Sequence, residues 1–212
     1  MIAEKDRGKL IKLFESLLQD VKVVVFSQEI ECGFCQTTRQ ILEEVSALSQ
    51  KISLEVYDFV KDEALARRYG ISRIPATILI GDRDYGIRFY GTPAGYEFTT
   101  LIQDIIMVSR RDPGLPKEVL DELQKIDQPV HIQVMISPTC PYCAAAVASV
   151  HRFAMANEFI TGDMVELAEF PHLAVKYNVQ GVPKIIINEK ESVTGVLNEM
   201  DLARELLKAI GK

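Results

Sequence analysis

Short apolar runs and amphipathic stretches alternate along the chain, and the same order of elements occurs twice. Residues 23–26 form a continuous apolar run rich in β-branched side chains, as in a strand buried on both faces. Residues 52–58 alternate apolar and polar side chains, and apolar residues at helical spacing lie between these two runs. The pattern predicts parallel strands joined by a helix and then an antiparallel hairpin, which gives an α/β fold with a mixed sheet flanked by helices.

Each half is predicted to follow the order helix, strand, helix, strand, helix, strand, strand, helix. In the first half these elements cover residues 6–19, 23–26, a helix ending near 49, 52–58, 64–69, 77–80, 85–90 and a helix that opens at 91–93. In the second half they cover 116–125, 131–136, 144–155, 164–167, 172–177, 184–187, a short strand ending at 195, and 198–210 with Asn198 as N-cap. Polar residues 110–116, with two prolines and a glycine, predict a boundary between two tandem domains, 1–112 and 113–212.

Two C-x-x-C motifs mark the repeat. Cys32 with Cys35 follows the first buried run, and Cys140 with Cys143 follows its counterpart 108 residues later. A proline lies 43 residues after the first cysteine in both halves, at Ile74-Pro75 and at Val182-Pro183. A repeat of this length is a whole domain, because solenoid units have only about 20–50 residues.

Composition narrows the class of protein. The formal net charge is −6, and no basic stripe indicates a nucleic-acid or anionic-membrane partner. The N-terminus is charged and amphipathic, unlike a secretory signal, and no apolar run reaches the ~18 residues of a membrane span. We therefore expect a cytoplasmic protein. Domains of about 105 residues bury modest cores, so the two halves are expected to support each other across an interface.

The place of each motif, between a strand and a helix, favours redox chemistry. The free N–H groups and positive end of a helix dipole stabilise a thiolate, the form that attacks a disulfide. Cys32 and Cys140 lie at that end, so we assign them as nucleophiles. Cys35 and Cys143 lie one helical turn further on, where they can attack the mixed disulfide and close an intramolecular bond. Pro141 suits the first helical position because it lacks an N–H group.

Zinc binding is an alternative use of four cysteines in two C-x-x-C pairs. Each pair, however, heads its own repeat and is followed by a proline that zinc does not require. A disulfide across two residues restricts the unfolded chain little, which also disfavours a purely structural role. In a cytosolic protein the pattern is typical of a catalytic redox site, and we expect no metal and no other bound cofactor.

With these motifs the chain resembles the glutaredoxin-like protein disulfide oxidoreductases of thermophiles, which have two thioredoxin-like domains and are related to protein disulfide isomerase. C-P-Y-C at Cys140 matches the glutaredoxin active site, and C-G-F-C at Cys32 is a close variant. Thioredoxins carry a buried Asp six residues before the first cysteine, where this chain has Phe26 and Val134. A proton acceptor for the resolving thiol must therefore lie elsewhere.

The resemblance implies cis peptide bonds at Ile74-Pro75 and Val182-Pro183. These residues would face the dithiols and pair with the backbone of an extended substrate segment. It also implies dithiol–disulfide exchange on protein substrates, by reduction, oxidation or isomerisation. Phe34 and Tyr142, inside the two motifs, either line the substrate surface or are simply exposed aromatic residues.

The two sites are expected to differ in reactivity. Glu29 and Glu31 flank Cys32, whereas residues 137–139 before Cys140 are uncharged. Nearby carboxylates disfavour a thiolate. We therefore expect Cys140 to have the lower pKa and the second site to be the stronger oxidant and the faster to react.

Other polar residues have simpler interpretations. Asp58 and Glu166 occupy equivalent positions after a strand, where acids usually cap turns. His131, His151 and His172 match nothing between the repeats and are expected to be structural or solvated, on a strand, a helix and a loop.

The sequence thus predicts an enzyme for thiol–disulfide exchange in proteins. It contains no G-x-G-x-x-G motif and no P-loop, so electrons are expected from a separate thioredoxin-reductase-like flavoenzyme or from glutathione. One alternative is a dedicated dithiol electron donor to a peroxidase or a reductase. Another is a binding module that holds unfolded chains and uses its dithiols only secondarily.

Overall fold

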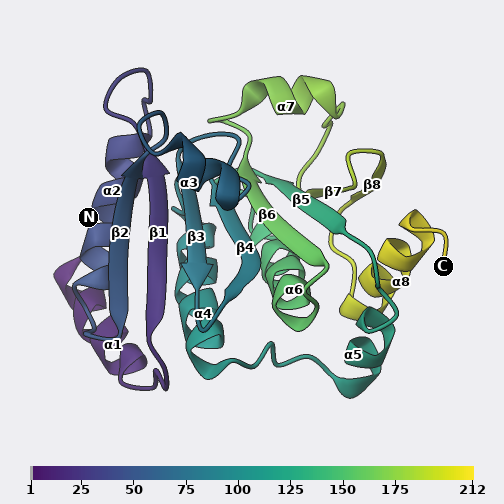
Figure 1. Cartoon of the computed structure of the whole chain (residues 1–212), viewed down its shortest axis with the longest axis horizontal. Coiled ribbons are helices and arrows are strands. Elements are labelled where there is room, and N and C mark those ends of the chain that lie inside the picture. Colours follow the sequence, from purple (N-terminus) through teal and green to yellow (C-terminus); the bar gives the residue numbers. More distant parts are fainter. Residues whose placement is uncertain (1) are drawn as a thin grey trace.

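The computed structural model describes residues 2–212 and confirms the α/β fold, with the predicted order of elements in each half (Figure 1). The first half contains α1 (Glu4–Phe14), β1 (Val21–Ser27), α2 (Cys35–Ser46), β2 (Ile52–Asp58), α3 (Glu63–Arg68), β3 (Ala76–Ile80), β4 (Asp84–Tyr90) and α4 (Tyr96–Arg110). The second half contains α5 (Lys117–Leu123), β5 (Val130–Ile136), α6 (Cys143–Ala156), β6 (Ile160–Glu166), α7 (Pro171–Lys176), β7 (Lys184–Ile187), β8 (Glu191–Thr194) and α8 (Glu199–Ala209). The division into domains 1–112 and 113–212 stays a prediction.

The strands within residues 2–212 form one mixed sheet in the order β2-β1-β3-β4-β6-β5-β7-β8. The halves meet where β4 pairs in parallel with β6, from Ile87 opposite Gly162 to Tyr90 opposite Val165. The interface expected between the halves is therefore a seam inside a continuous sheet. Backbone hydrogen bonds and packing on both faces hold the two repeats together.

Helices cover both faces of this sheet, and the side chains of β1 show why both faces are buried. Val23 and Val25 point into a core shared with α1, α2, α4, α5, α6 and α8. Val24 and Phe26 point the other way, into a second core that includes residues of α3 and α7. The sheet thus separates two apolar layers, the larger of which lies under the helices that carry the cysteines (Figure 1).

Both C-x-x-C motifs lie at the same edge of the sheet. β1 and β4 are each antiparallel to β3 and so point the same way, and β4, β6 and β5 are mutually parallel. The chain therefore leaves β1 and β5 at one common edge (Figure 1). Four interstrand steps separate β1 from β5, which is roughly 19 Å at the usual spacing of strands.

The opening helix is shorter than the predicted residues 6–19, because it ends at Phe14. Beyond it, the backbone N–H groups of Leu18 and Gln19 donate to the hydroxyl of Ser109 at 2.9 and 3.0 Å. These bonds hold the segment in a non-helical conformation against the end of α4. Tertiary contacts therefore override the helical pattern of the sequence here.

The strand predicted at 164–167 begins earlier, at Ile160. Gly162 lies inside this strand, where a β-carbon would be 2.7 Å from the Val150 side chain, so its role is close packing under α6. Asp163 is also buried within the strand, and its Oδ2 lies 2.7 Å from Nε2 of His131. A close approach to α6 and a buried polar pair thus explain why the strand starts before its apolar run.

The histidines have the structural or solvated roles expected of them. His151 is fully buried, with Nδ1 2.6 Å from Oδ2 of Asp104 and with Nε2 3.2 Å from the carbonyl oxygen of Arg88. His131 bridges acidic side chains on the opposite face of the sheet. His172 is exposed in α7, so it lies on a short helix and not in a loop.

Candidate active sites

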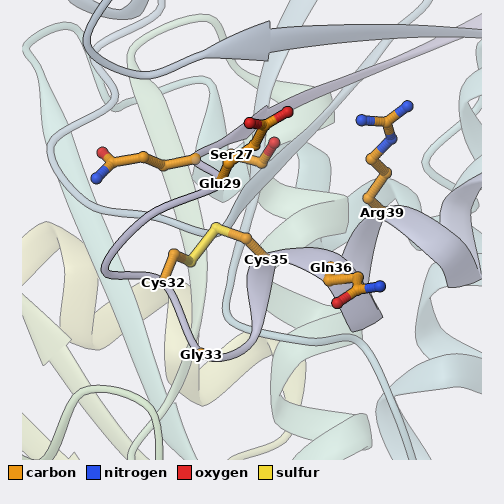
Figure 2. Close-up of a pocket in the computed structure, with 8 residues that line it drawn as sticks. Ser27, Glu29, Cys32, Gly33, Cys35, Gln36 and Arg39 are labelled. Atoms are coloured by element: carbon orange, nitrogen blue, oxygen red, sulfur yellow. A yellow bond between two sulfur atoms is a disulfide. The ribbon is translucent and has the colours of Figure 1, made fainter.

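The first dithiol lies just after β1 and is oxidised. Cys32 and Cys35 form a disulfide with an S–S distance of 2.01 Å and a Cα–Cα distance of 5.5 Å. Cys35 is 2% exposed at the start of α2, while Cys32 is half-buried. A cavity of about 570 Å³ opens beside the disulfide, with the charged side chains of Glu29 and Arg39 at its wall (Figure 2). A protein thiol or disulfide can therefore reach this site from solvent.

The second dithiol repeats this geometry with less exposure. Cys140 and Cys143 are bonded at a Cα–Cα distance of 5.5 Å and are 7% and 0% exposed. In both sites the helix begins at the second cysteine, with Phe34 or Tyr142 as the N-cap residue. Pro141 therefore lies in the turn before α6, and the prediction that it takes the first helical position is wrong. A turn hydrogen bond from the N–H group of Cys143 to the carbonyl oxygen of Cys140 spans Pro141 ahead of the helix.

The cysteine pairs belong to separate sites. Each pair is closed by its own disulfide, and the four strand steps between them separate the two sulfur pairs. A single zinc site built from all four thiolates does not fit this arrangement. Residues 2–212 also contain no group of three or more His, Cys, Asp or Glu side chains that could hold a metal ion.

Both prolines have the peptide geometry that the resemblance implied. The Ile74-Pro75 and Val182-Pro183 bonds are cis. Because Ala76 pairs with Phe26, and Lys184 with Met135, each proline lies beside the end of the strand that leads to a dithiol. The structure thus places each predicted proline at the same end of the sheet as its cysteine pair, and the role of these residues in binding substrate stays a prediction.

Phe34 and Tyr142 lie next to the buried cysteines but point outward, with 46% and 69% of their surfaces exposed. An exposed aromatic ring beside a reactive sulfur suits contact with an apolar substrate segment. That assignment stays a prediction.

The acids that end β2 and β6 cap turns, as expected. Oδ1 of Asp58 accepts from the N–H groups of Val60 and Lys61, and these backbone bonds lower the pKa of Asp58. Oε1 of Glu166 accepts from the N–H group of Ala168, but burial raises the pKa of Glu166. Neither carboxylate needs a catalytic role to explain its position.

The first half of the chain also contributes to the second site. Residues 91–95 are a loop and α4 begins at Tyr96, later than the sequence predicted. A β-carbon added to Gly95, which has φ of +62°, would lie 2.8 Å from the carbonyl oxygen of Pro138. Pro138 belongs to the turn that carries Cys140, so the start of α4 lies against the turn of the second dithiol.

Glu97 lies in this contact and was not among the predicted site residues. Helices α4 and α6 pack together and follow strands that point the same way, so they run in the same direction. His151 contacts Asp104 across them. The residues seven positions earlier on each helix therefore lie at about the same height, which places Glu97 level with Ala144, the residue after Cys143.

The environment of Glu97 suits proton transfer. Its side chain is 1% exposed and neither carboxyl oxygen has a hydrogen-bond partner of normal geometry within residues 2–212, although the nearby Thr100 hydroxyl partly offsets the effect of burial on its pKa. Burial raises the pKa of Glu97 to about 7, so the carboxyl can hold or release a proton near neutral pH. The sequence carried one signal for it, since Glu97, Leu101, Asp104 and Val108 form a stripe along one side of α4.

Comparison with known proteins identifies relatives over nearly the whole chain. Residues 130–208 match the family model for the thioredoxin domain. A protein disulfide oxidoreductase from Aeropyrum pernix superimposes with a TM-score of 0.91 and 30% identity, covering 98% of this chain and 93% of that one. The NTD_N/C domain of alkylhydroperoxide reductase AhpF from Enterococcus faecalis superimposes with a TM-score of 0.89 and 25% identity, covering 97% of this chain and 100% of that one.

Sequence comparison finds a longer relative. The alkyl hydroperoxide reductase protein AhpF of Staphylococcus aureus is 26% identical over 168 residues, which are 79% of this chain. The chain spans only 31% of the length of that protein. Within residues 2–212 no helix is both long enough and apolar enough to cross a bilayer.

The tandem thioredoxin folds, the paired dithiols and the end-to-end likeness to a 30% identical relative agree with one another. The chain belongs to the family of protein disulfide oxidoreductases with two thioredoxin-fold units, and it is a thiol–disulfide oxidoreductase with two C-x-x-C sites.

Proposed function

We propose that the chain exchanges disulfides with protein substrates, and that it can reduce, oxidise and isomerise them. The observation that carries this proposal is the shared sheet edge, where each dithiol lies beside a strand entered through a proline. An extended substrate segment can pair with the backbone before β3 or β7 and present its sulfur to the first cysteine.

In the reducing direction, the thiolate of Cys32 or Cys140 attacks one sulfur of the substrate disulfide, and the other substrate sulfur leaves as a thiolate. Cys35 or Cys143 then loses its proton and attacks the mixed disulfide, releasing the first substrate sulfur. Two electrons pass from the dithiol to the substrate, and the released thiolates take up protons. Oxidation is the reverse sequence, and isomerisation occurs when a second substrate thiol resolves the mixed disulfide.

Glu97 has a specific role in these reaction steps at the second site. We assign it as the group that accepts the proton of Cys143 when that thiol attacks, because it is buried on α4 level with the start of α6 and its pKa is about 7. The first site has an open cavity with Glu29 in its wall, so its resolving thiol can lose a proton to solvent.

The electron source belongs to the same proposal. The chain contains no dinucleotide-binding motif, so a thioredoxin-reductase-like flavoenzyme or glutathione would reduce the two disulfides. Such donors are cytoplasmic reductants, in keeping with a cytoplasmic location for this chain.

Refolding and reduction assays test the proposal directly. We expect the wild type to refold scrambled ribonuclease and to reduce insulin, and we expect the double-serine variants of each site to separate the contributions. Matched variants are Cys32→Ser with Cys35→Ser and Cys140→Ser with Cys143→Ser. Loss of neither activity in a chain with all four substitutions would contradict the proposal.

A dedicated electron donor to a peroxidase is the second candidate, favoured by the likeness to AhpF. It predicts fast turnover with one peroxidase and little refolding of scrambled ribonuclease. A binding module is the third candidate, and it predicts that Cys32→Ser with Cys140→Ser fully retains suppression of aggregation. Peroxidase turnover and ribonuclease refolding by the wild type, together with suppression of aggregation by the variant with Cys32→Ser and Cys140→Ser, distinguish the three candidates.

A further inference from the structure

A carboxylate of the second half holds a loop of the first half. Glu169, in the turn after β6, accepts a hydrogen bond from the backbone N–H group of Thr92 at 2.7 Å. Its own N–H group donates to the carbonyl oxygen of Glu166, which fixes the turn. The bond to Thr92 therefore connects the two repeats at the edge that carries the dithiols.

The loop held by Glu169 contacts both the proline and the helix of the first site. The N–H group of Gly91 donates to the carbonyl oxygen of Pro75 at 2.9 Å, and the two hydroxyl oxygens of Thr92 and Thr38 are 2.9 Å apart. Thr38 is fully buried on α2, three residues after Cys35. Residues 91–92 thus link the proline at the start of β3 to the helix that carries Cys35.

The loop of the first half leaves space for the turn after β6, which carries Glu166 and Glu169. Gly91 has φ of +100°, and a β-carbon there would lie 2.7 Å from Cβ of Glu166 and 3.2 Å from Cδ of Glu169. Only glycine fits this position without moving the turn. Burial raises the pKa of Glu169, and its Oε2 is buried with no partner within residues 2–212, so its burial costs free energy that the Thr92 bond only partly offsets.

Among residues 2–212 the contact from Glu169 to Thr92 has no counterpart at the second site. The residue equivalent to Glu169 in the first repeat, 108 positions earlier, is the exposed Lys61. At the second site the start of α4 lies instead against Pro138, in the turn that carries Cys140. The two dithiols are therefore supported by different contacts, and in each case the contact comes from the other half of the chain.

We propose that Glu169 is a positioning residue for the first dithiol, which acts through Thr92 to hold Pro75 and Thr38 in register on either side of Cys32 and Cys35. The inference rests on the proposed function only in taking Cys32 as nucleophile and Cys35 as resolving thiol. It makes the resolution step at the first site depend on the second half of the chain.

The test uses the full chain with Cys140→Ser and Cys143→Ser, so that only the first site reacts. The reduced protein is mixed with the aromatic disulfide dithiobis(nitrobenzoate). Cys32 displaces one nitrothiolate and Cys35 then displaces the other, closing the Cys32–Cys35 bond and passing two electrons to the probe. We expect Glu169→Ala to slow the second release about tenfold, as small misplacements of reacting groups do, while the first release stays within about twofold.

Rescue and coupling distinguish positioning from folding. Glu169→Gln keeps an acceptor oxygen for the Thr92 N–H group and should restore most of the rate. Thr92→Val removes the hydroxyl link to Thr38, and combined with Glu169→Ala it should add little further loss, because both changes break one chain of contacts. The matched control is Lys61→Ala, at the repeat-equivalent position, which should leave the second release unchanged.

The same Glu169→Ala change is then made in the chain with Cys32→Ser and Cys35→Ser, where we expect no effect on the second site. Equal slowing in both chains together with a lower melting temperature would overturn the proposal in favour of a general role in folding. An unchanged second release at the first site would also overturn it. Because the probe is a small molecule, these outcomes do not depend on whether proteins are the substrates.

Discussion

Nδ1 of His151 lies 2.6 Å from Oδ2 of Asp104 in the buried contact between α6 and α4. The other ring nitrogen of His151 donates to the carbonyl oxygen of Arg88, so one proton is shared between the imidazole and the carboxyl group. The contact joins the two repeats and sets the alignment of the helices that places Glu97 level with the start of α6, where Cys143 lies.

Breaking this pair should weaken the whole fold. We expect Asp104→Ala to lower the free energy of unfolding by about 3–5 kcal/mol, because it leaves a buried imidazole without its partner. Urea unfolding followed by circular dichroism measures the change. Asp104→Leu with His151→Phe should recover most of the loss, and exposed Asp121→Ala should have almost no effect. An equally small effect of Asp104→Ala would show that the pair does not hold the halves together.

Glu97 should make stability depend on pH. Its pKa rises from an ordinary 4.5 to about 7 on folding, so the folded chain binds more protons than the unfolded chain between these values. The contribution of Glu97 to the free energy of unfolding should therefore fall by about 3 kcal/mol as pH rises through this window, and level off above it. Glu97→Gln should remove the decline, which denaturant unfolding at several pH values between the two limits would detect.

Glu97 should also control the resolution step of the second site. In the chain with Cys32→Ser and Cys35→Ser, we expect Glu97→Gln to slow attack by Cys143 about 100-fold and to abolish an inflection near the Glu97 pKa in the rate profile. Single-turnover reduction of insulin across that pH range gives the profile. If the inflection persists in the variant, another group takes the proton.

The two nucleophiles should differ in acidity. We expect Cys140 to titrate at a lower pH than Cys32, because residues 137–139 are uncharged whereas Glu29 and Glu31 flank Cys32. Ultraviolet titration of the thiolate in each single-site chain measures both values. Finding Cys32 the more acidic would reverse the predicted order of reactivity.

Asn198 caps α8 as the sequence predicted, since its side chain accepts from the N–H group of Asp201. Replacing it by alanine should lower the free energy of unfolding by about 1 kcal/mol, and Asn198→Ser should lose less because serine also caps. Thermal unfolding of both variants tests this. Equal stability of the alanine variant and the wild type would contradict a capping role.

The sequence predicted the fold and the paired sites because their signals are local or repeated. The dithiols, the two prolines and the strand order each occur twice at one offset, so each copy supports the other. The β4–β6 seam was not predicted, because pairing Ile87 with Gly162 depends on two strand edges that are distant in the chain. Glu97 was missed because a helical stripe predicts burial of the position but not the absence of a partner for its carboxyl group.

Trapping the mixed disulfide tests the central claim most directly. Reduced chains with Cys35→Ser and Cys143→Ser cannot resolve the intermediate and should accumulate covalent adducts with scrambled ribonuclease. Mass spectrometry of digests should then identify Cys32 and Cys140 as the linked residues, with Cys140 linked first. Absence of adducts at both cysteines, while the wild type still exchanges disulfides, would contradict the assignment of these residues as the nucleophiles.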